Sequence, residues 1–560
     1  MERSGAEIIV TLLERQGVDV VAGIPGGANL PLYDALHASR IRHVLARHEQ
    51  GAGFIAQGLA RATGTASVCL ASSGPGATNL VTALADAMSD SIPLVAITGQ
   101  VPTSLIGTNA FQEVDTVGIT RPITKKNYFV RSASELLATI PEAFAVAGSG
   151  RPGPVLVDVP KDVQTQTVPV EAWPAPGRPS PWPEPDAAAI AHVASLIARA
   201  RRPILYVGGG IIASGASAEV VALARRADLF VTSSLHGLGA FPSDDPLFLG
   251  MLGMHAAPYT NHTLDQADLV IAVGARFDDR ATGKPSEFCP RATIVHVDVD
   301  AREIGKIKPV LRGAVGDARS VLRALLRQVR PAQRPEWRAR VAALRAEHPL
   351  PLEAHGATDF LRALAKRVPR TTIITTDVGQ HQMWVAQVYP FSEPRTLLTS
   401  GGLGTMGFGV PAAIGAALAR PDRRVVCVTG DGSLLMNIQE LSTLAELGLA
   451  VAVVVLNNGH LGLVRQQQEL FYGERYQASR FHAKPNFAAI ARGFGVPAFD
   501  VAPPSDVGWE LTVLEQALRE PGPVLVNVPI SPLQMVLPMV PPGAANRDMI
   551  GARAARITSS

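Results

Sequence analysis

The chain has 560 residues, of which 47% are hydrophobic and only 18% are charged. At about 150 residues per domain this length predicts three or four domains, and the composition excludes wholesale disorder, which needs low hydrophobicity and high net charge. The 51 Lys and Arg against 48 Asp and Glu give a net charge of +3, so no basic or acidic excess points to nucleic acid or to a membrane surface.

The N-terminal segment predicts a helix and not a signal peptide. Glu2, Glu7 and Glu14 interrupt it in an amphipathic pattern, whereas a signal peptide has a basic start and an unbroken apolar run. The longest apolar run, residues 449–456, is far shorter than the roughly 20 residues that cross a bilayer. The three cysteines stand far apart without a CxxC pair, which encodes neither a disulfide framework nor a zinc site. We expect a soluble, cytoplasmic protein.

Two stretches interrupt the globular pattern. Residues 169–186 are dense in proline and predict an extended linker. Residues 328–356 are charged and flanked by prolines, which indicates a second connection that contains one helix. The expected domains are residues 1–168, 187–330 and 357–540, followed by a tail over residues 541–560.

Short, continuous apolar runs recur in all three expected domains, separated by segments of helical periodicity. Runs of this kind suit parallel strands that are buried on both faces. Their alternation with helices predicts the α/β class with parallel sheets. The clearest runs are residues 66–71, 92–98, 203–208, 267–274, 293–299, 424–430 and 450–457.

The first and third domains share an internal sequence repeat. Residues 68–98 and 425–457 align without a gap at an offset of 358 residues, which places Cys69 on Cys427. In both segments a strand leads into a Gly-rich turn, a helix and a second strand. Such units are common, so chance is one interpretation; a duplicated and diverged domain is the sharper one.

Polar residues follow two neighbouring strands of the third domain. Asp431 comes directly after one strand, in Gly-Asp-Gly-Ser, and Asn458 follows the next. Both belong at the same carboxyl edge of a right-handed βαβ unit. Carboxylate and amide oxygens suit Mg²⁺, which also binds phosphates, and a helix that begins near Ser433 would add an anion site. Either segment alone is an ordinary turn, but together they predict a magnesium-diphosphate site.

The middle domain favours nucleotide binding more weakly. Gly208, Gly209 and Gly210 follow one apolar run, and Asp298 stands at an acidic strand end. The glycines do not complete the GxGxxG pattern, so this signal has little specificity by itself.

GDG followed by NN at this spacing is similar to the motif of thiamine-diphosphate-dependent enzymes, and further segments narrow the resemblance. Nearly the whole chain resembles the catalytic large subunits of acetolactate synthases, also called acetohydroxyacid synthases. The segments are IPGGANLPLYDAL (24–36), LARHEQGAGFIAQG (45–58), SSGPGATNLVTALADA (72–87), ITGQVP (97–102), FQEVD (111–115), RPGPVLVDVPKDVQ (151–164), LGMLGMH (249–255), GARFDDRATGK (274–284), TTDVGQHQMW (375–384), TSGGLGTMGFGVPAAIGAALA (399–419) and VPPGAAN (540–546).

The resemblance implies three doubly wound parallel-sheet domains of the thiamine-diphosphate-dependent decarboxylase type. They would bind the pyrimidine, FAD, and the diphosphate with Mg²⁺, in that order. The implied reaction decarboxylates pyruvate and transfers the hydroxyethyl group to a second pyruvate, giving acetolactate, or to 2-ketobutyrate, giving acetohydroxybutyrate. This is the first common step of branched-chain amino-acid biosynthesis. The implied partners are a second copy of the chain, in a homodimer or higher homo-oligomer, and a small regulatory subunit.

Three residues carry the implied catalysis. Glu49 matches the family's catalytic glutamate, which holds a proton on the aminopyrimidine ring of the cofactor. A lone Glu at a helix start more often only stabilises the helix dipole, so the assignment depends on the motif around it. Gln112 matches a glutamine that reaches the reacting centre, and Lys161 lies at the mouth of the pocket.

The resemblance also implies the binding residues. Asp431, Asn458 and the backbone carbonyl of His460 match the metal ligands. The thiamine diphosphate contacts would be Gly26, Gly27, Gln380, His381, Gly404, Met406, Gly432, Ser433, Asn458 and His460. FAD, which the family requires without net redox chemistry, would be contacted by Arg151, Gly209, His255, Gly274, Arg276, Asp298 and Asp317. Phe111, Met383 and Gln467 would face the substrates.

Gln467 is a departure from the family pattern. Most members carry a tryptophan at this place, after NNxHLGxVxQ, and only a minority isozyme type resembles this chain. The residue faces the second substrate in the family, so the change bears on which 2-keto acid is accepted.

Two rival functions are weighed against this one. Another thiamine-diphosphate enzyme is the first: a pyruvate oxidase would use FAD for electron transfer, and a different 2-keto-acid carboligase such as glyoxylate carboligase would lack the carboxylate at Glu49. A non-catalytic nucleotide-binding protein is the second. It predicts loss of the ionisable and metal positions, yet Glu49, Gln112, Asp431 and Asn458 are all present.

Overall fold

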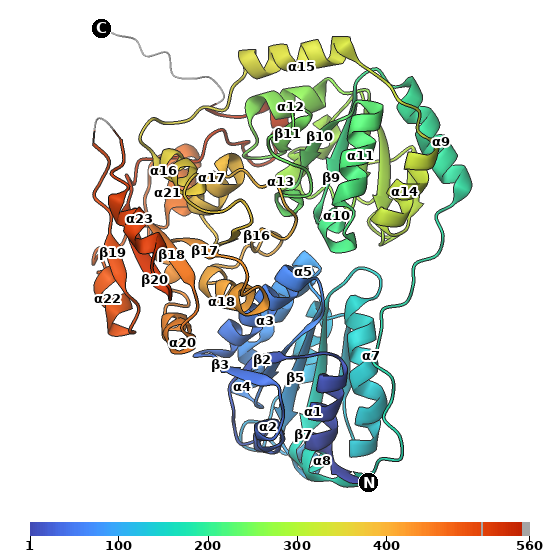
Figure 1. Cartoon of the computed structure of the whole chain (residues 1–560), viewed down its shortest axis with the longest axis vertical. Helices are drawn as coiled ribbons and strands as arrows, with labels where there is room; N and C mark the ends of the chain where they lie inside the picture. The colour runs from blue at the N-terminus through green and yellow to red at the C-terminus, as the bar shows by residue number, and fades with distance from the viewer. Residues whose placement is uncertain (506–507, 552–560) are drawn as a thin grey trace.

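Three six-stranded parallel sheets organise the chain, each covered by helices on both faces (Figure 1). The computed structural model describes residues 1–505 and 508–551; residues 552–560 of the expected tail lie outside the described residues. The N-terminal sheet has the spatial order β3 (Arg42–Leu45), β2 (Val20–Gly23), β4 (Ser67–Ala71), β5 (Leu94–Gln100), β7 (Pro154–Pro160) and β6 (Lys126–Phe129).

The C-terminal sheet repeats this strand order, whereas the central sheet has a different one. The central sheet has the order β11 (Phe248–Met251), β10 (Phe230–Ser233), β9 (Pro203–Val207), β12 (Leu269–Val273), β13 (Thr293–Asp298) and β14 (Arg312–Val315). The C-terminal sheet has the order β16 (Leu397–Leu398), β15 (Ile373–Thr376), β17 (Val425–Gly430), β18 (Val451–Asn457), β20 (Val524–Pro529) and β19 (Ala498–Asp500).

The α/β class with parallel sheets is confirmed. Every continuous apolar run singled out in the sequence forms a strand at the interior of a sheet, and β4, β5, β9, β12 and β17 are buried along their whole length. The physical reason is that helices cover both faces, so each residue of such a strand packs on apolar neighbours.

The helices that build these layers alternate with the strands. Ser4 and Glu7 cap the first helix reciprocally: the Ser4 hydroxyl accepts from the Glu7 amide, and the Glu7 carboxylate accepts from the Ser4 amide over 2.7 Å. The principal helices are α1 (Gly5–Arg15), α2 (Leu30–His37), α3 (Glu49–Thr63), α5 (Val81–Asp90), α7 (Leu136–Gly148), α9 (Ala187–Arg199), α11 (Ser217–Ala227), α12 (Pro258–Asp265), α14 (Ala318–Gln328), α16 (Ala357–Ala365), α17 (Gln380–Val388), α18 (Gly409–Ala419), α20 (Glu440–Leu447), α21 (Gly462–Phe471), α22 (Phe487–Gly493) and α23 (Thr512–Leu518).

The two segments of the internal sequence repeat, residues 68–98 and 425–457, occupy equivalent places in their sheets. β4 and β5 are third and fourth in the N-terminal sheet, and β17 and β18 are third and fourth in the C-terminal sheet. Both sheets also have the same pattern of crossovers. This equivalence favours a duplicated domain over a chance repeat of one βαβ unit.

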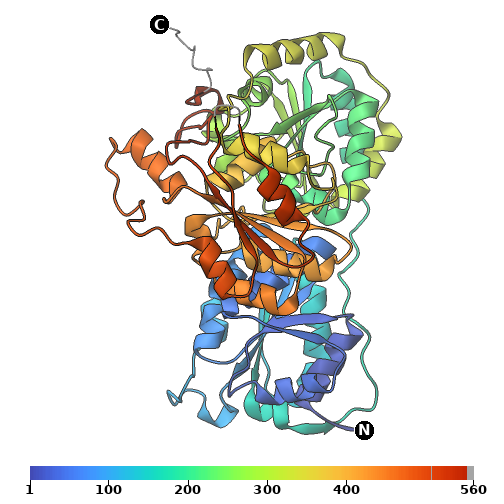
Figure 2. The same cartoon turned by 60° about the vertical axis from the view of Figure 1, so that its left-hand side comes forward.

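The connections run over the surface. Residues 170–186 form an extended segment that climbs from the N-terminal domain to α9, and α15 (Pro335–Glu347) lies in the second connection (Figure 1). The turned view shows the C-terminal sheet between the other two domains (Figure 2). Among the described helices, none is long and apolar enough to cross a membrane.

Helices α3 and α18 join the N- and C-terminal domains in close backbone contact. A Cβ on Gly58 would lie 2.2 Å from the carbonyl oxygen of Ala412, and one on Gly415 would lie 2.0 Å from that of Ile55. Only glycine allows this approach. The crossing fixes how the two domains of one chain pack together.

Asp158, on the buried strand β7, is a carboxyl group with an unusual titration. The Thr98 hydroxyl donates to it over 2.7 Å and the Gln100 amide over 3.1 Å, but burial dominates and raises the pKa of Asp158 to about 7. The unfolded chain has an ordinary Asp pKa of about 3.9. The native state therefore binds one more proton than the unfolded state between these two values, and this costs stability as the pH rises.

We expect Asp158→Asn to remove this pH dependence. Between pH 5 and pH 7 the free energy of unfolding of the wild type should fall relative to the variant by on the order of 2 kcal/mol, at about 1.4 kcal/mol per pH unit. Denaturant unfolding at the two pH values measures the difference. Asp34→Asn, an exposed carboxyl on α2, controls for the loss of one negative charge. A difference that does not change with pH would contradict the assignment.

Candidate active site

Each sheet has a place near its middle where the strand order reverses, and the residues singled out in the sequence gather around these places. The reversal falls between β2 and β4, between β9 and β12, and between β15 and β17. The loops after the two strands leave toward opposite faces there, and open α/β sheets bind ligands in the resulting crevice at the carboxyl ends. The three crevices are therefore the candidate binding sites.

Asp431 and Asn458 come together at the carboxyl ends of β17 and β18, beside the C-terminal crevice. The Gly459 amide donates to Asp431 Oδ2 over 2.7 Å, and the His460 amide donates to Asn458 Oδ1 over 2.9 Å. Burial raises the pKa of Asp431 to about 6, against hydrogen bonds from Gly432 and Gly459 that act in the opposite direction. A carboxylate and an amide oxygen thus stand side by side at the strand ends.

The helix at this turn begins earlier than the sequence analysis predicts. It spans Asp431–Leu434 as α19 and starts at Asp431 instead of near Ser433, because strand β17 passes into the helix at Gly430 without a loop. The Ser433 hydroxyl donates to the carbonyl of Val378 over 2.6 Å. Asp431 therefore lies in the first helical turn, where a negative charge is favourable.

A metal at this crevice would depend on few protein ligands. Within residues 1–505 and 508–551 there is no cluster of three His, Cys, Asp or Glu side chains placed to hold a metal. One carboxylate with amide and backbone oxygens suits Mg²⁺, which completes its shell with water and phosphate oxygens. The donor set therefore fits a magnesium-diphosphate and not a metal held by protein alone.

His381, near the start of α17, faces the same crevice. It is buried, and burial lowers its pKa to about 3, which keeps the imidazole neutral. Its Nε2 atom has no hydrogen-bond partner among the described residues. A Cβ on Gly430 would lie 2.9 Å from the ring, so the crevice is shaped around it. A buried nitrogen without a partner beside a helix start fits an oxygen of the diphosphate.

Gln380 is held by residues that sequence reasoning missed. Its Nε2 donates to Gln466 Oε1 over 3.0 Å and to the carbonyl of Gln534 over 2.8 Å, and its Oε1 accepts from Asn458 over 3.2 Å. Gln466 is completely buried in α21. These partners are 86 and 154 residues from Gln380 in the sequence. We call this set of hydrogen bonds the Gln380 clamp. No sequence pattern predicts it, because a polar residue in a helix looks like any other.

Asp377 was also missed, and it fixes the loop that carries Gly404 and Met406. Its carboxylate accepts from the amides of Gly407 over 2.7 Å and Gly409 over 3.2 Å. Burial raises the pKa of Asp377 to about 6. Gly404 has a positive φ of 71° and Met406 is half-buried. The sequence signal that could have identified Asp377 is its place directly after the buried strand β15.

Glu49 begins α3 at the N-terminal crevice. Its Oε2 accepts from Asn79 over 2.9 Å, and none of the described residues hydrogen-bonds to its Oε1. Gly26 lies against Ser72, whose hydroxyl would be 2.4 Å from an added Cβ, while the space beside Gly27 is open. The carboxylate thus keeps one oxygen available for a ligand in this crevice.

The loop with Phe111 and Gln112 lies over the same edge. Gln112 has a φ of 61° and packs on Gly74, where an added Cβ would lie 2.8 Å from the Gln112 Cβ. Phe111 is 87% exposed, and Lys161 is half-buried at the start of α8 (Lys161–Thr165). The described residues of its own chain cover little of this aromatic side chain.

The central crevice brings Gly274 against Gly210, the residue after Gly209. The Gly210 amide donates to the carbonyl of Gly274 over 3.1 Å, and Gly274 has a φ of 59°. Asp298 ends β13 close by in the sheet, and burial raises its pKa to about 6. Close backbone approach with a strand-end carboxyl is the arrangement that binds a dinucleotide and its ribose.

Arg151 and Arg276 converge although they come from different domains. Both guanidinium groups donate to the carbonyl of Ser89, over 3.2 Å and 2.7 Å. Burial lowers the pKa of Arg151, and the charge of Arg276 adds to this. Two adjacent cations fit an anionic ligand such as the diphosphate of FAD.

The other two FAD candidates have structural partners. His255 is buried and its Nδ1 lies 3.0 Å from the carbonyl of Pro538, and burial lowers its pKa to about 4. Asp317 caps α14 by accepting from the Ser320 amide over 2.9 Å. His255 therefore connects the central domain to the C-terminal segment, whereas Asp317 lies next to β14 at the edge of the central sheet.

The two remaining substrate candidates lie on different helices. Met383 packs at the rim of the C-terminal core on α17, whereas Gln467 is exposed on α21, next to the buried Gln466. The exposed amide of Gln467 has no hydrogen-bond partner among the described residues.

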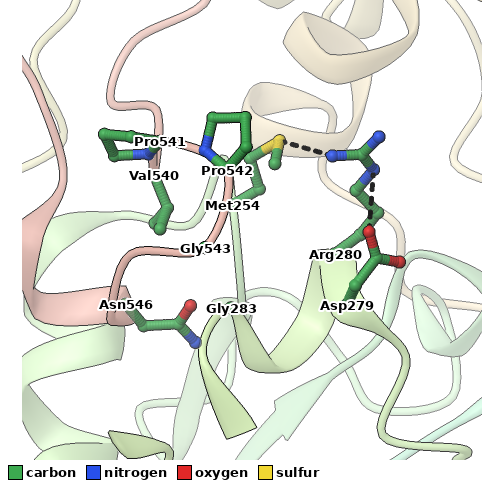
Figure 3. Close-up of a pocket in the computed structure, with 9 residues that line it drawn as sticks. All are labelled: Met254, Asp279, Arg280, Gly283, Val540, Pro541, Pro542, Gly543 and Asn546. Carbon is green, nitrogen blue, oxygen red and sulfur yellow. Dashed lines mark hydrogen bonds and ion pairs between the residues drawn. The ribbon is translucent and has the colours of Figure 1, made fainter.

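A small cavity opens between the central domain and the C-terminal segment (Figure 3). It has a volume of about 90 Å³ and is lined by Met254 and Arg280 on one side and by residues 540–543 on the other. The Arg280 guanidinium contacts Met254 Sδ at 3.7 Å and Asp279 at 3.8 Å. Sequence reasoning quoted the motif around Arg280 without singling out this cation.

Comparisons with known proteins identify all three domains. The thiamine pyrophosphate enzyme N-terminal TPP binding domain matches residues 3–119, the central domain of these enzymes matches residues 190–325, and the C-terminal TPP binding domain matches residues 377–528. Acetolactate synthase isozyme 1 large subunit of Escherichia coli is 53% identical over 98% of both chains. The chain belongs to the acetolactate synthase large-subunit family.

Other relatives agree with this membership. Acetolactate synthase isozyme 2 large subunit of E. coli is 45% identical over 98% of this chain and 99% of its own. The large subunit of Parasynechococcus marenigrum is 48% identical over 98% of this chain and 91% of its own. Thiamine diphosphate, Mg²⁺ and FAD are the cofactors of this family, and the three crevices fit them.

We expect Gly462→Ala to weaken binding of thiamine diphosphate with Mg²⁺. The added Cβ would lie 2.2 Å from Gln380 Oε1 and 2.6 Å from Asn458 Nδ2, so both side chains must move. Overpacking of this kind costs about 1–3 kcal/mol, or roughly 5- to 150-fold in affinity. Titration of the cofactor, followed by intrinsic fluorescence, measures the change. Gly493→Ala, a helix position with open space around it, should leave the affinity unaltered; equal losses in both variants would refute the Gln380 clamp.

Proposed function

We propose that this protein is an acetolactate-forming enzyme that decarboxylates pyruvate and joins the remaining two-carbon unit to a second 2-keto acid. The second acid is pyruvate or 2-ketobutyrate, and the products supply branched-chain amino-acid biosynthesis. The observation that carries the proposal is the arrangement of Asp431, Asn458 and His381 at the switch point of the C-terminal sheet, within a chain that is 53% identical to a known large subunit.

Glu49 is the proposed acid–base group. Thiamine diphosphate, when bound, supplies a carbon nucleophile for the keto carbon of pyruvate. Glu49 holds a proton on a ring nitrogen of the pyrimidine through its free Oε1, while Asn79 keeps the other oxygen in place. Gln112 and Lys161 lie on the loops over the same edge and would orient the substrate.

Arg280 is a proposed contact for the carboxylate of a 2-keto acid. It lies on α13 (Asp279–Thr282) and lines the small cavity. Its exposed guanidinium has Met254 on one side and Asp279, at a distance of 3.8 Å, on the other (Figure 3). Guanidinium groups bind carboxylates through two parallel hydrogen bonds. The proline and glycine of residues 541–543 leave the opposite wall free of competing charge.

A homodimer is the proposed assembly. Several large apolar side chains are exposed beside the proposed site. Exposed apolar patches of this kind mark interaction surfaces. Phe111 is 87% exposed, Met436 is 52% exposed and Leu403 is 48% exposed. A second copy of the chain would cover them and complete the site. Because the three relatives described above are all named as large subunits, a smaller partner subunit is proposed as well.

The reaction itself is tested by incubating the purified protein with pyruvate, Mg²⁺ and thiamine diphosphate. Acid treatment of the product should yield acetoin, with no electron acceptor required and with FAD needed for full activity. Glu49→Gln keeps the shape but removes the acid–base group, so turnover should fall by about 10²–10⁴-fold while the cofactors still bind. A requirement for an electron acceptor would favour a pyruvate oxidase, and unchanged turnover in the variant would exclude Glu49.

The assembly is tested by complementation. If each site uses Glu49 of one chain and Asp431 of the other, a hybrid of Glu49→Ala and Asp431→Ala chains has one intact site. Mixing the two inactive proteins should restore up to about half of the activity per dimer. Purified hybrids without activity would argue against shared sites.

Gln467 is the proposed determinant of the second substrate. 2-Ketobutyrate exceeds pyruvate by one methylene, whose burial is worth about 0.8 kcal/mol, and pockets built for it discriminate by about 10- to 200-fold. An amide gives the extra methyl little contact, so we expect only a weak preference for 2-ketobutyrate. Gln467→Trp should raise it. The ratio of the two products at equal substrate concentrations measures this, and a ratio unmoved by tryptophan would remove Gln467 from the site.

A further inference from the structure

The C-terminal end of helix α5 lies where all three domains meet. In Figure 1 this helix stands at the top of the N-terminal domain and faces α10 (Gly209–Ser214) of the central domain and β16 of the C-terminal domain. Its last two turns carry Asp86 and Asp90, both without exposed side-chain surface. Two buried carboxylates one turn apart need strong compensation.

Asp90 receives four donors from three domains. Arg61 of α3 donates over 2.8 Å, His236 of the central domain lies at 2.9 Å, and the backbone amides of Gly401 and Gly402 donate over 3.1 Å and 2.7 Å. Burial acts to raise the pKa of Asp90, but the charges of His236 and Arg61 hold it far below its usual range. The carboxylate is therefore a fixed negative charge.

Asp86 extends the same contacts to the loop that leads to Gly404 and Met406. It accepts from the hydroxyls of Ser400 and of Thr405, the latter over 3.0 Å. The Thr405 amide in turn donates to the Ser400 hydroxyl over 2.8 Å. Asp86 and Asp90 together hold residues 400–405, which adjoin the proposed pyrimidine contacts.

The same turn of α5 touches the proposed FAD site. The carbonyl of Ser89 accepts from Arg151 and Arg276, and the Ser91 hydroxyl accepts from Arg151 over 2.7 Å. His236 lies under Gly209, where an added Cβ would be 3.1 Å from the His236 Cβ. Gly209 belongs to the central crevice.

We propose that Asp90 and His236 are positioning residues that couple the two cofactor sites, so that bound FAD strengthens the binding of thiamine diphosphate. This inference rests on the proposed function, because both sites are the proposed ones. FAD at Gly209 and Arg276 would hold His236 and the end of α5 in the arrangement that these contacts define. Thiamine diphosphate at Met406 requires an ordered 400–405 loop, and the second ligand then pays less of the shared ordering cost. A cofactor that carries no electrons would thereby serve as a structural effector.

The proposal is tested with apo-protein. Thiamine diphosphate is titrated at fixed Mg²⁺, with and without saturating FAD, and bound cofactor is followed by tryptophan fluorescence. Wild type should bind it about 5- to 150-fold more tightly with FAD. The reverse titration of FAD must give the same factor, since coupling between binding sites is reciprocal.

His236→Phe keeps the ring volume and removes the contact with Asp90, so the factor should fall to about 1–2. His236→Gln can still donate to Asp90 and should retain most of it. Arg225→Gln breaks an exposed ion pair with Asp245 in the same domain and is the control with an unchanged factor. If His236→Phe does not fold, His236→Asn removes the same contact with a shorter side chain.

The outcomes separate the two claims. Tight binding of both cofactors with no FAD effect in wild type, or with the same factor in His236→Phe, would overturn the coupling and leave the proposed function intact. A wild type that binds neither thiamine diphosphate nor FAD would refute the proposed function and the coupling with it.

Discussion

In a parallel sheet every strand ends at the same edge, and each of the three sheets has a point near its middle where the strand order reverses. Residues that follow neighbouring strands are therefore brought together in pairs: Gly26 with Ser72, Gly210 with Gly274, and Asp431 with Gly459. The remaining features of the sites depend on this constraint, because it places short polar loops and helix starts around one crevice in each domain.

Buried polar groups then fix the crevices relative to one another. Asp377, Asp86 and Asp90 are buried carboxylates that each accept hydrogen bonds from a loop of the proposed sites, and Asp90 also accepts from Arg61 of α3. Such groups contribute little net stability, since removing a charge from water offsets most of what its partners give. Their effect is to define one arrangement of loops that lack regular secondary structure. The glycine contacts between α3 and α18 add a rigid backbone reference.

The sequence anticipated much of this because the signals it used are local. Continuous apolar runs identified the interior strands, and the internal sequence repeat at an offset of 358 residues identified two domains of equal topology. The Gly-Asp-Gly turn and the asparagine after the next strand led to the C-terminal crevice, although the helix begins at Asp431 and not at Ser433. Proline density identified the extended connection before α9.

The sequence by itself therefore determined the class of fold, the strand ends and the chemical types at each crevice, since these follow from burial on two faces and from turns. Only the tertiary structure decided the partners: Gln380 with Gln466, and Asp90 with His236, which are 86 and 146 residues apart. The reason is that a hydrogen bond between domains imposes no period on the chain, and a buried glutamine or histidine looks locally like any other. Their roles emerge only when the three sheets are packed together.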